Sequence, residues 1–426
     1  MEQDAKGIRC QSATYPKVQN LMHNVNEETL MEKHVKQNKK KATGVDGVGK
    51  LEYDKNAEEN IADLVKRMKQ FSYKPQPVRR TYIPKANGKM RPLGIPAYED
   101  RLVQGVMSDL LNDVYEVRFL DCSHGFRPER NAHDVVKYIN QTIMSKKVGY
   151  VLEADIKGFF DNVNHDWLMK FLENDIQDKN FLRYVKRFLI AGVMEGTEVL
   201  DSDKGTPQGG QISPILANVY LHYALDLWIE KVIKPKLIGE AYYVRYADDF
   251  LIMFQYENEA KKVMEALKTR LAKFSLEVAE DKTRILPMGR FKGTKESFDF
   301  LGFTFYNTKS RKGKYMLGIR TSEKKLKAKR QAAKEWLRTR LTKPVSETME
   351  KLSAALRGHY NYYGVNGNYK FLQKFYNYVM LTTYRMLNRR DQKGKMQPPK
   401  FMRIWCYYMT SPHTTKDIWN WQPKTA

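Results

Sequence analysis

The feature that most restricts the fold of this chain is an apolar segment interrupted by two adjacent aspartates. Residues 241–246 and 250–254 are rich in aromatic and aliphatic side chains, and Asp248 and Asp249 lie between them. This pattern predicts two strands joined by a short acidic turn. A separate, mostly apolar run over residues 148–156 also reaches a carboxylate, Asp155, near its end. We therefore expect strands from two parts of the chain to bring carboxylates together.

Three carboxylates close together need a cation. Two of them about 4 Å apart repel each other by roughly 4 kcal/mol at an effective dielectric constant of 20. Ligands that are all oxygen atoms select magnesium-type ions, which also bind phosphates. Two such ions about 3.5–4 Å apart can activate an attacking 3′-hydroxyl and stabilise a leaving pyrophosphate. The residues alone therefore indicate magnesium-dependent phosphoryl transfer on nucleic acid, whereas Asp248 and Asp249 by themselves would better fit a solvated acidic turn.

The charge of the chain indicates a polyanionic partner. Lys and Arg number 74 and Asp and Glu number 49, so the net charge is +25. Residues 309–343 include fourteen basic residues and only two acidic ones. Nucleic acid or an anionic membrane surface would neutralise such an excess. No stretch approaches the roughly 18 apolar residues that span a bilayer, and the N-terminus has no signal-peptide core. We therefore expect a soluble protein on the reducing side of the membrane.

Cysteine usage excludes two further kinds of structure. Cys10, Cys122 and Cys406 lie far apart, and the sequence has no CxxC pair. A disulfide framework and a cysteine-rich structural zinc site are both excluded on this ground.

A glycine-rich loop, residues 205–214 (Gly-Thr-Pro-Gln-Gly-Gly-Gln-Ile-Ser-Pro), is the second candidate for a functional element. Its three glycines would allow the backbone to approach a ligand closely. Ser213 and Pro214 predict the start of a helix, with the serine as N-cap and the proline in the first turn. The alternative is an ordinary loop that leads into a core helix.

Local patterns predict the elements around these candidates. Apolar residues recur at helical spacing within residues 58–71, 326–341 and 349–363, and residues 100–120 and 131–145 also predict helices. Asn87-Gly88, between two runs that carry basic residues, predicts a β-hairpin over residues 79–96. The mixture of strands and helices up to about residue 308 indicates one α/β unit, with a boundary near residue 310 and another near 385.

Three motifs occur in the order expected of a reverse transcriptase. They are residues 155–161 (Asp-Ile-Lys-Gly-Phe-Phe-Asp), the loop with Gln208-Gly209 and Ser213-Pro214, and residues 246–249 (Tyr-Ala-Asp-Asp). Over roughly residues 40–380 the chain resembles the reverse transcriptase/maturase encoded by bacterial group II introns. Supporting stretches are residues 83–85, 91–96, 125–128, 300–303 and 356–360.

This resemblance implies an α/β (α+β) right-hand polymerase, in which fingers and a palm with an antiparallel sheet are followed by an α-helical thumb. The implied divisions are an N-terminal extension at 1–44, reverse transcriptase fingers and palm at 45–309, a thumb or maturase domain at 310–385, and a short basic and aromatic DNA-binding region at 386–426. Many relatives also carry an endonuclease domain with zinc-binding CxxC pairs. Because this sequence has none, we expect no zinc and no second-strand cleavage.

The resemblance also implies roles at the carboxylates. Asp155 and Asp248 would bridge two Mg²⁺ ions, Asp249 would support them, and the carbonyl of Ile156 would be a further ligand. The implied nucleotide-binding residues are Phe160 as a steric gate against the ribose 2′-hydroxyl, Lys85 and Arg91 as a triphosphate clamp, Gln208 against the sugar, and Lys282 as a general acid for pyrophosphate. The implied nucleic-acid-binding residues are Lys324, Lys325, Lys327, Lys329 and Arg330.

The function implied is an RNA-directed DNA polymerase that copies intron RNA into cDNA during retrohoming and also acts as a maturase. Its partners would be group II intron RNA, an RNA–DNA template–primer duplex, target DNA and deoxynucleoside triphosphates, but no membrane. It would lie in the bacterial cytoplasm, on the nucleoid when acting on DNA. Two alternatives stay open: a CRISPR-associated or phage-defence reverse transcriptase, and a pure RNA-binding maturase. Clustered carboxylates speak against the latter, because a non-catalytic chain has no need of them.

Overall fold

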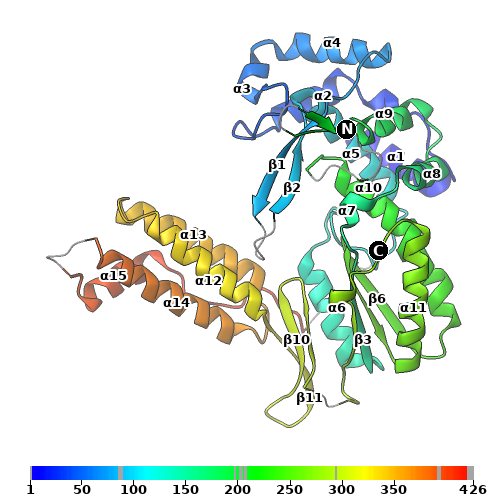
Figure 1. Cartoon of the computed structure of the whole chain (residues 1–426). Coiled ribbons are helices and arrows are strands. Elements are labelled where there is room, and N and C mark those ends of the chain that lie inside the picture. Colours follow the sequence, from blue (N-terminus) through cyan, green and yellow to red (C-terminus); the bar gives the residue numbers. More distant parts are fainter. Residues whose placement is uncertain are drawn as a thin grey trace.

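The computed structural model describes residues 2–84, 90–195, 198–200, 205, 209–292, 295–390 and 395–419. Lys85, Gln208 and the turn at Asn87-Gly88 lie outside these described residues. Figure 1 shows three parts: N-terminal helices with a projecting hairpin, a sheet flanked by helices, and an elongated group of C-terminal helices.

Helix α5 (Tyr98–Glu116) is the centre of the N-terminal part and is buried along most of its length. Helices α1 (Glu2–Thr14) and α2 (Glu27–Val35) pack against it, and Ile8 and Leu30 from these helices belong to the same core. Residues 1–44, predicted as an extension, thus help to complete the core around α5. The other helices of this part are α3 (Lys50–Tyr53) and α4 (Ala57–Lys69), with 3-10 turns at Met22–Asn24 and Asp54–Asn56.

The predicted β-hairpin is confirmed. Strands β1 (Val78–Pro84) and β2 (Met90–Ile95) pair antiparallel, with Ile83 opposite Arg91. Strand β4 (Val193–Glu195) adds to β1 in parallel, and β5 (Glu198–Leu200) follows it, so the strand order is β2-β1-β4-β5. In Figure 1 this hairpin projects from the N-terminal helices toward the C-terminal ones.

A second sheet, called the central sheet below, has the order β6-β7-β3-β8 and is antiparallel throughout. Its strands are β3 (Tyr150–Asp155), β6 (Ala241–Tyr246), β7 (Asp249–Phe254) and β8 (Arg284–Pro287). The predicted arrangement of strand, acidic turn and strand over residues 241–254 is therefore confirmed. Helices α6 (Ala132–Ser145) and α11 (Glu257–Lys273) flank the sheet (Figure 1).

Both faces of the central sheet are buried, because its strands are apolar on both sides. Leu152, Phe250 and Ile252 share a core with α11 and the N-terminal helices. Their neighbours Val151 and Leu251 belong to a second core, which includes α6 and the C-terminal helices. Alternate residues of one strand thus hold two layers together, as the period of two of a β-strand requires.

The basic segment begins as strand rather than helix. Strands β9 (Ser297–Phe300), β10 (Phe303–Lys309) and β11 (Tyr315–Thr321) form a third, antiparallel sheet. Phe303 lies opposite Thr321 and Lys309 opposite Tyr315, so the predicted boundary at residue 310 falls in the turn of a hairpin.

The C-terminal helices are α12 (Glu323–Arg338), α13 (Val345–Tyr363), α14 (Tyr369–Leu387) and α15 (Pro398–Tyr408). The first two confirm the helices predicted at 326–341 and 349–363. Tyr360 and Tyr363 of α13 are buried. Phe401 and Trp405 of α15 are buried too, so these C-terminal aromatic residues serve the core, whereas Tyr407 is exposed.

The remaining α-helices of the described residues are α7 (Phe159–Asn162), α8 (His165–Asp175), α9 (Lys179–Leu189) and α10 (Ser213–Leu221). The predicted serine N-cap is wrong by one residue, because Ile212 holds the cap position of α10. The Ser213 N–H already donates to the carbonyl of Gly210 at 3.3 Å, so the chain enters the helix earlier. Pro214 lies in the first turn, as predicted. Among the described helices, none is both long and apolar enough to cross a bilayer.

Candidate active site

Strand register brings the predicted carboxylates to one end of the central sheet. Asp155, the last residue of β3, lies directly opposite Asp249, the first residue of β7. Asp248 occupies the two-residue turn between β6 and β7, after Ala247. The three aspartates thus lie at one edge, although Asp155 is almost a hundred residues away in the sequence.

The electrostatics of this edge indicate a shortage of positive charge. Burial, together with the charge of Asp155, raises the pKa of Asp248. Desolvation, followed by the charges of Asp248 and Asp155, raises the pKa of Asp249 to about 7. Because Asp249 is exposed by its accessible surface, we give the repulsion by the two neighbouring carboxylates more weight than the desolvation. Both shifts mean that the environment disfavours the ionised carboxylates, which a bound cation would reverse.

Lys282 supplies part of the missing charge. Its ammonium group forms an ion pair with the Oδ2 of Asp155. The hydrogen bond to Asp155 raises the pKa of Lys282, so this lysine stays protonated. Lys282 therefore lies at the predicted site, where its side chain contacts a carboxylate rather than solvent alone.

The donor set at this edge fits a hard divalent cation. Three carboxylates offer only oxygen atoms, which Mg²⁺ prefers. Next to them, the Asp155 carbonyl accepts from the Ala279 N–H at 2.8 Å and the Lys157 N–H donates to the Glu277 carbonyl at 2.9 Å. The role of the Ile156 carbonyl as a further ligand stays a prediction. Within the described residues, however, no group of three or more Asp, Glu, His or Cys side chains is arranged so that it could hold a metal ion.

Phe160 lies on α7, shortly after Asp155. Its ring is half-buried and packs on the ring of Phe159 at 5.4 Å between centroids, while Phe159 is only 2% exposed. A Cβ at Gly205 would lie 3.0 Å from the Phe160 carbonyl. The start of the glycine-rich loop thus covers α7 and leaves part of the Phe160 ring accessible.

Two glycines of that loop lie close to the protein backbone. Gly209 has φ +121°, and a Cβ there would lie 2.4 Å from the carbonyl oxygen of Gly94 on β2. Gly205 therefore lies against α7 and Gly209 against the hairpin, while the approach of the loop to a ligand stays a prediction. Arg91, on the same hairpin, is exposed, and its charge acts on Asp248, whose pKa it lowers against the larger effect of burial.

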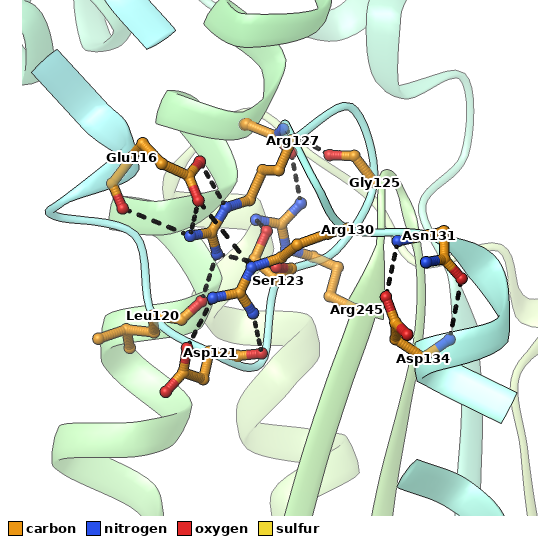
Figure 2. A network of polar contacts seen from close by, with 11 residues as sticks. Glu116, Leu120, Asp121, Ser123, Gly125, Arg127, Arg130, Asn131, Asp134 and Arg245 are labelled. Atoms are coloured by element: carbon orange, nitrogen blue, oxygen red, sulfur yellow. Dashed lines mark hydrogen bonds and ion pairs between the residues drawn. The ribbon is translucent and has the colours of Figure 1, made fainter. Parts of the chain in front are cut away.

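The chain segment before α6 supports the acidic turn, and the sequence did not assign it this role. A Cβ at Gly125 would lie 2.3 Å from the Ala247 nitrogen, so the two backbones are in contact. Arg127 holds the same segment by donating to Glu116, to the Leu120 carbonyl and to the Ser123 carbonyl (Figure 2). Residues 125–128, noted only as a supporting motif, therefore have a structural explanation.

We expect the substitution Gly125→Ala to lower primer extension at least tenfold. The added methyl group would displace the backbone of Ala247, and Asp248 and Asp249 follow it directly. Steady-state primer extension with Mg²⁺ checks this result. Gly7→Ala is the matched control, because a Cβ at that helical position meets nothing within 4 Å. Equal activity of the two variants would contradict the role of Gly125.

The predicted nucleic-acid-binding residues separate into two groups. Lys324, Lys325 and Lys327 are exposed on α12. Lys329 is half-buried, with its Nζ 3.3 Å from His359 Nδ1 and 4.8 Å from the Tyr363 ring centre, and burial lowers its pKa. Arg330 stacks on Tyr378 of α14 at 5.2 Å. Lys329 and Arg330 thus pack against neighbouring helices, unlike the three exposed lysines.

A groove of about 900 Å³ is lined by residues of α12 and α14. It is lined by Glu323, Lys324, Leu326, Lys327, Arg330, Gln331, Phe371, Lys374 and Tyr378. Four of these residues are basic and one is acidic, and two are aromatic. Basic side chains beside aromatic rings are typical of surfaces that bind single-stranded nucleic acid.

The central sheet and its three aspartates lie within a stretch of the chain that matches a known protein family. Residues 83–305 match the family described as Reverse transcriptase (RNA-dependent DNA polymerase). The match covers just over half of the 426 residues and contains all three aspartates. The chain belongs to the reverse transcriptase family.

Relatives within this family refine the comparison. The chain is 38% identical over 234 residues to the group II intron-encoded protein LtrA of Lactococcus lactis subsp. cremoris. The aligned stretch covers 54% of this chain and 38% of LtrA. The chain is also 30% identical over 303 residues to protein YkfC of Escherichia coli (strain K12), covering 63% of this chain and 77% of YkfC. The predicted resemblance to group II intron proteins is confirmed, and the chain spans well under half of LtrA.

Proposed function

We propose that this protein is an RNA-directed DNA polymerase that copies intron RNA into cDNA and binds that RNA as a maturase. The observation that carries the proposal is the register of the central sheet, which pairs Asp155 with Asp249 beside Asp248 inside the family match. The names of relatives support the intron: LtrA is a group II intron-encoded protein, and a 96-residue stretch is 34% identical to mitochondrial nuclear intron maturase 1 of Arabidopsis thaliana.

In this proposal the three parts of the chain are those of a right-hand polymerase. The β1-β2 hairpin and the helices around α5 act as fingers, the central sheet as the palm, and α12–α15 as the thumb. The hairpin and the C-terminal helices lie on the same side of the central sheet in Figure 1. A template–primer duplex would contact the protein on that side. The excess of basic residues on α12 would neutralise its phosphates.

Asp155, Asp248 and the Ile156 carbonyl would hold two Mg²⁺ ions, with Asp249 in support. The ions, when bound, supply the charge that activates the primer 3′-hydroxyl and stabilises the leaving pyrophosphate. Arg91 would contact the triphosphate, and Phe160 would exclude a 2′-hydroxyl. Lys282 is protonated and would donate a proton to pyrophosphate once released from Asp155. Lys85 and Gln208, outside the described residues, keep the roles predicted from the sequence.

Primer extension on an RNA template tests the polymerase proposal directly. The purified full chain should extend a DNA primer with deoxynucleoside triphosphates and Mg²⁺, and EDTA should stop the reaction. Binding to a folded group II intron RNA is measured in parallel. Tight RNA binding without primer extension would instead identify a pure RNA-binding maturase.

The groove between α12 and α14 gives a second prediction. Replacing Lys324, Lys327 and Lys374 by glutamine should weaken RNA binding, and each lost phosphate contact should reduce the slope of log K against log[salt] by about 0.7–0.9. The matched control replaces Lys334, Lys370 and Lys400, which do not line the groove, so that both variants lose three charges. A titration across a salt series checks the slopes. Identical slopes for the two triple variants would show that these lysines are only a solvated helix face.

A further inference from the structure

Arg245 is a fully buried arginine on β6, two residues before the turn that carries Asp248. Its side chain and that of Asp226, at the end of the π-helical turn His222–Asp226, are both 0% exposed. They form a forked ion pair, with Nε 2.7 Å from Oδ1 and Nη2 2.6 Å from Oδ2. Buried charges are tolerated only when they are paired and fully hydrogen-bonded. An apolar pair could fill this space without that demand, so the ion pair has another use.

The remaining donors of Arg245 reach the turn and the segment that supports it. Nη1 donates to the Ala247 carbonyl at 2.9 Å and to Asn218 Oδ1 at 3.0 Å. Nη2 also donates to the Ser123 hydroxyl at 2.8 Å (Figure 2). Asn218 in turn donates to the Gly125 carbonyl at 2.7 Å. One guanidinium therefore joins the turn, its supporting segment and α10.

Ala247 needs such a restraint. Its φ is +57°, a left-handed conformation that residues with a Cβ rarely adopt. Strained backbone of this kind persists where surrounding contacts determine it. The base of the restraint is itself fixed, because the Arg245 N–H donates to the Cys122 carbonyl at 2.7 Å and its carbonyl accepts from the His124 N–H at 2.9 Å.

We propose, resting on the proposed polymerase function, that Arg245 is a positioning residue for the metal-binding carboxylates. Paired with Asp226, it fixes the Ala247 carbonyl and thereby the direction in which Asp248 and Asp249 face the cations. The planar fork is essential to this role. A lysine can pair with Asp226, but its single ammonium group cannot reach the acceptors on Asn218, Ala247 and Ser123 together.

The test compares Arg245→Lys with a matched control, Arg118→Lys. Arg118 also pairs with a buried aspartate, Asp175, at 2.7 Å, and it donates to several carbonyls of the N-terminal segment. Within the described residues, Arg118 forms no hydrogen bond or ion pair with the acidic turn. Both variants should lower the melting temperature, because both lose bonds in a buried network.

Only Arg245→Lys should affect the turn. We expect amide hydrogen exchange in the peptide covering residues 246–250 to accelerate at least tenfold. We also expect the Mg²⁺ concentration for half-maximal primer extension to rise several-fold, with the RNA-binding constant unchanged. Arg118→Lys should leave both readouts as in the wild type. Asn218→Ala provides a second variant with the same expected pattern if Arg245→Lys does not fold.

Two results would overturn the positioning role. One is amide hydrogen exchange of residues 246–250 at the wild-type rate in folded Arg245→Lys. The other is an equal acceleration of that exchange in Arg118→Lys. The exchange measurement needs no enzymatic activity. A wild-type chain without primer extension would therefore refute the proposed function, while the exchange data would still decide whether Arg245 holds the turn.

Discussion

Asp248→Asn should lower cDNA synthesis at least a hundredfold, which corresponds to about 2.7 kcal/mol of transition-state stabilisation. Asparagine keeps the shape of the side chain but removes the negative charge that would hold Mg²⁺ at the turn. RNA binding should stay within a few-fold of the wild type, because the residue holds metal rather than template. Single-nucleotide extension on an RNA template, with RNA affinity measured on the same preparations, checks both expectations.

The same substitution should not destabilise the protein. The raised pKa of Asp248 means that folding disfavours its ionised form. A carboxyl group whose pKa is raised by folding stabilises the folded state at low pH, and this stabilisation is lost as the pH rises through the folded-state pKa. Removing the charge at neutral pH should therefore keep or raise the melting temperature in EDTA. Asp166→Asn, at an exposed position on α8, is the matched control and should extend primers like the wild type. Near wild-type extension by Asp248→Asn would remove this residue from the catalytic site.

The sequence predicts those parts of the site whose structure depends on local patterns of apolar and acidic residues. Apolar runs that end in aspartates predict strands, and buried strands fix their register by the period of two. These patterns predict that the carboxylates come together, and the structure adds the register, which places Asp155 opposite Asp249. The helices over residues 326–341 and 349–363 were likewise predictable from apolar spacing.

The part that the sequence does not predict depends on contacts between distant segments. The sequence gives no sign that Arg245, inside an apolar strand, will be buried. Its partner Asp226 lies in another element, and a further acceptor, Ser123, lies far away in the chain. Lys329 belongs to a run of exposed lysines and turns inward only because α13 supplies His359 and Tyr363. Likewise, a glycine at position 209 indicates that another group lies close to the backbone, but the sequence does not say which group. In the structure that group is the backbone of Gly94.

Phe160→Ala should raise the use of ribonucleotides relative to deoxynucleotides by about 10–200-fold, the range expected when one small steric clash is removed from a pocket. Deoxynucleotide incorporation should change only a few-fold, since the ring would contact the sugar only near C2′. Competition between each ribonucleotide and its deoxynucleotide in single-turnover extension measures the ratio.

The neighbouring residue makes this test decisive. Phe159 and Phe160 are adjacent on α7 and their rings are in contact, but Phe159 is buried while Phe160 is half-exposed. Phe159→Ala should therefore lower stability by about 3–5 kcal/mol, as large-to-small core substitutions do, without changing sugar selection. A gate at Phe160 predicts the opposite pattern: altered selection with a smaller loss of stability. Unchanged discrimination in Phe160→Ala would show that both rings belong to the core, and sugar selection would then have to come from another residue.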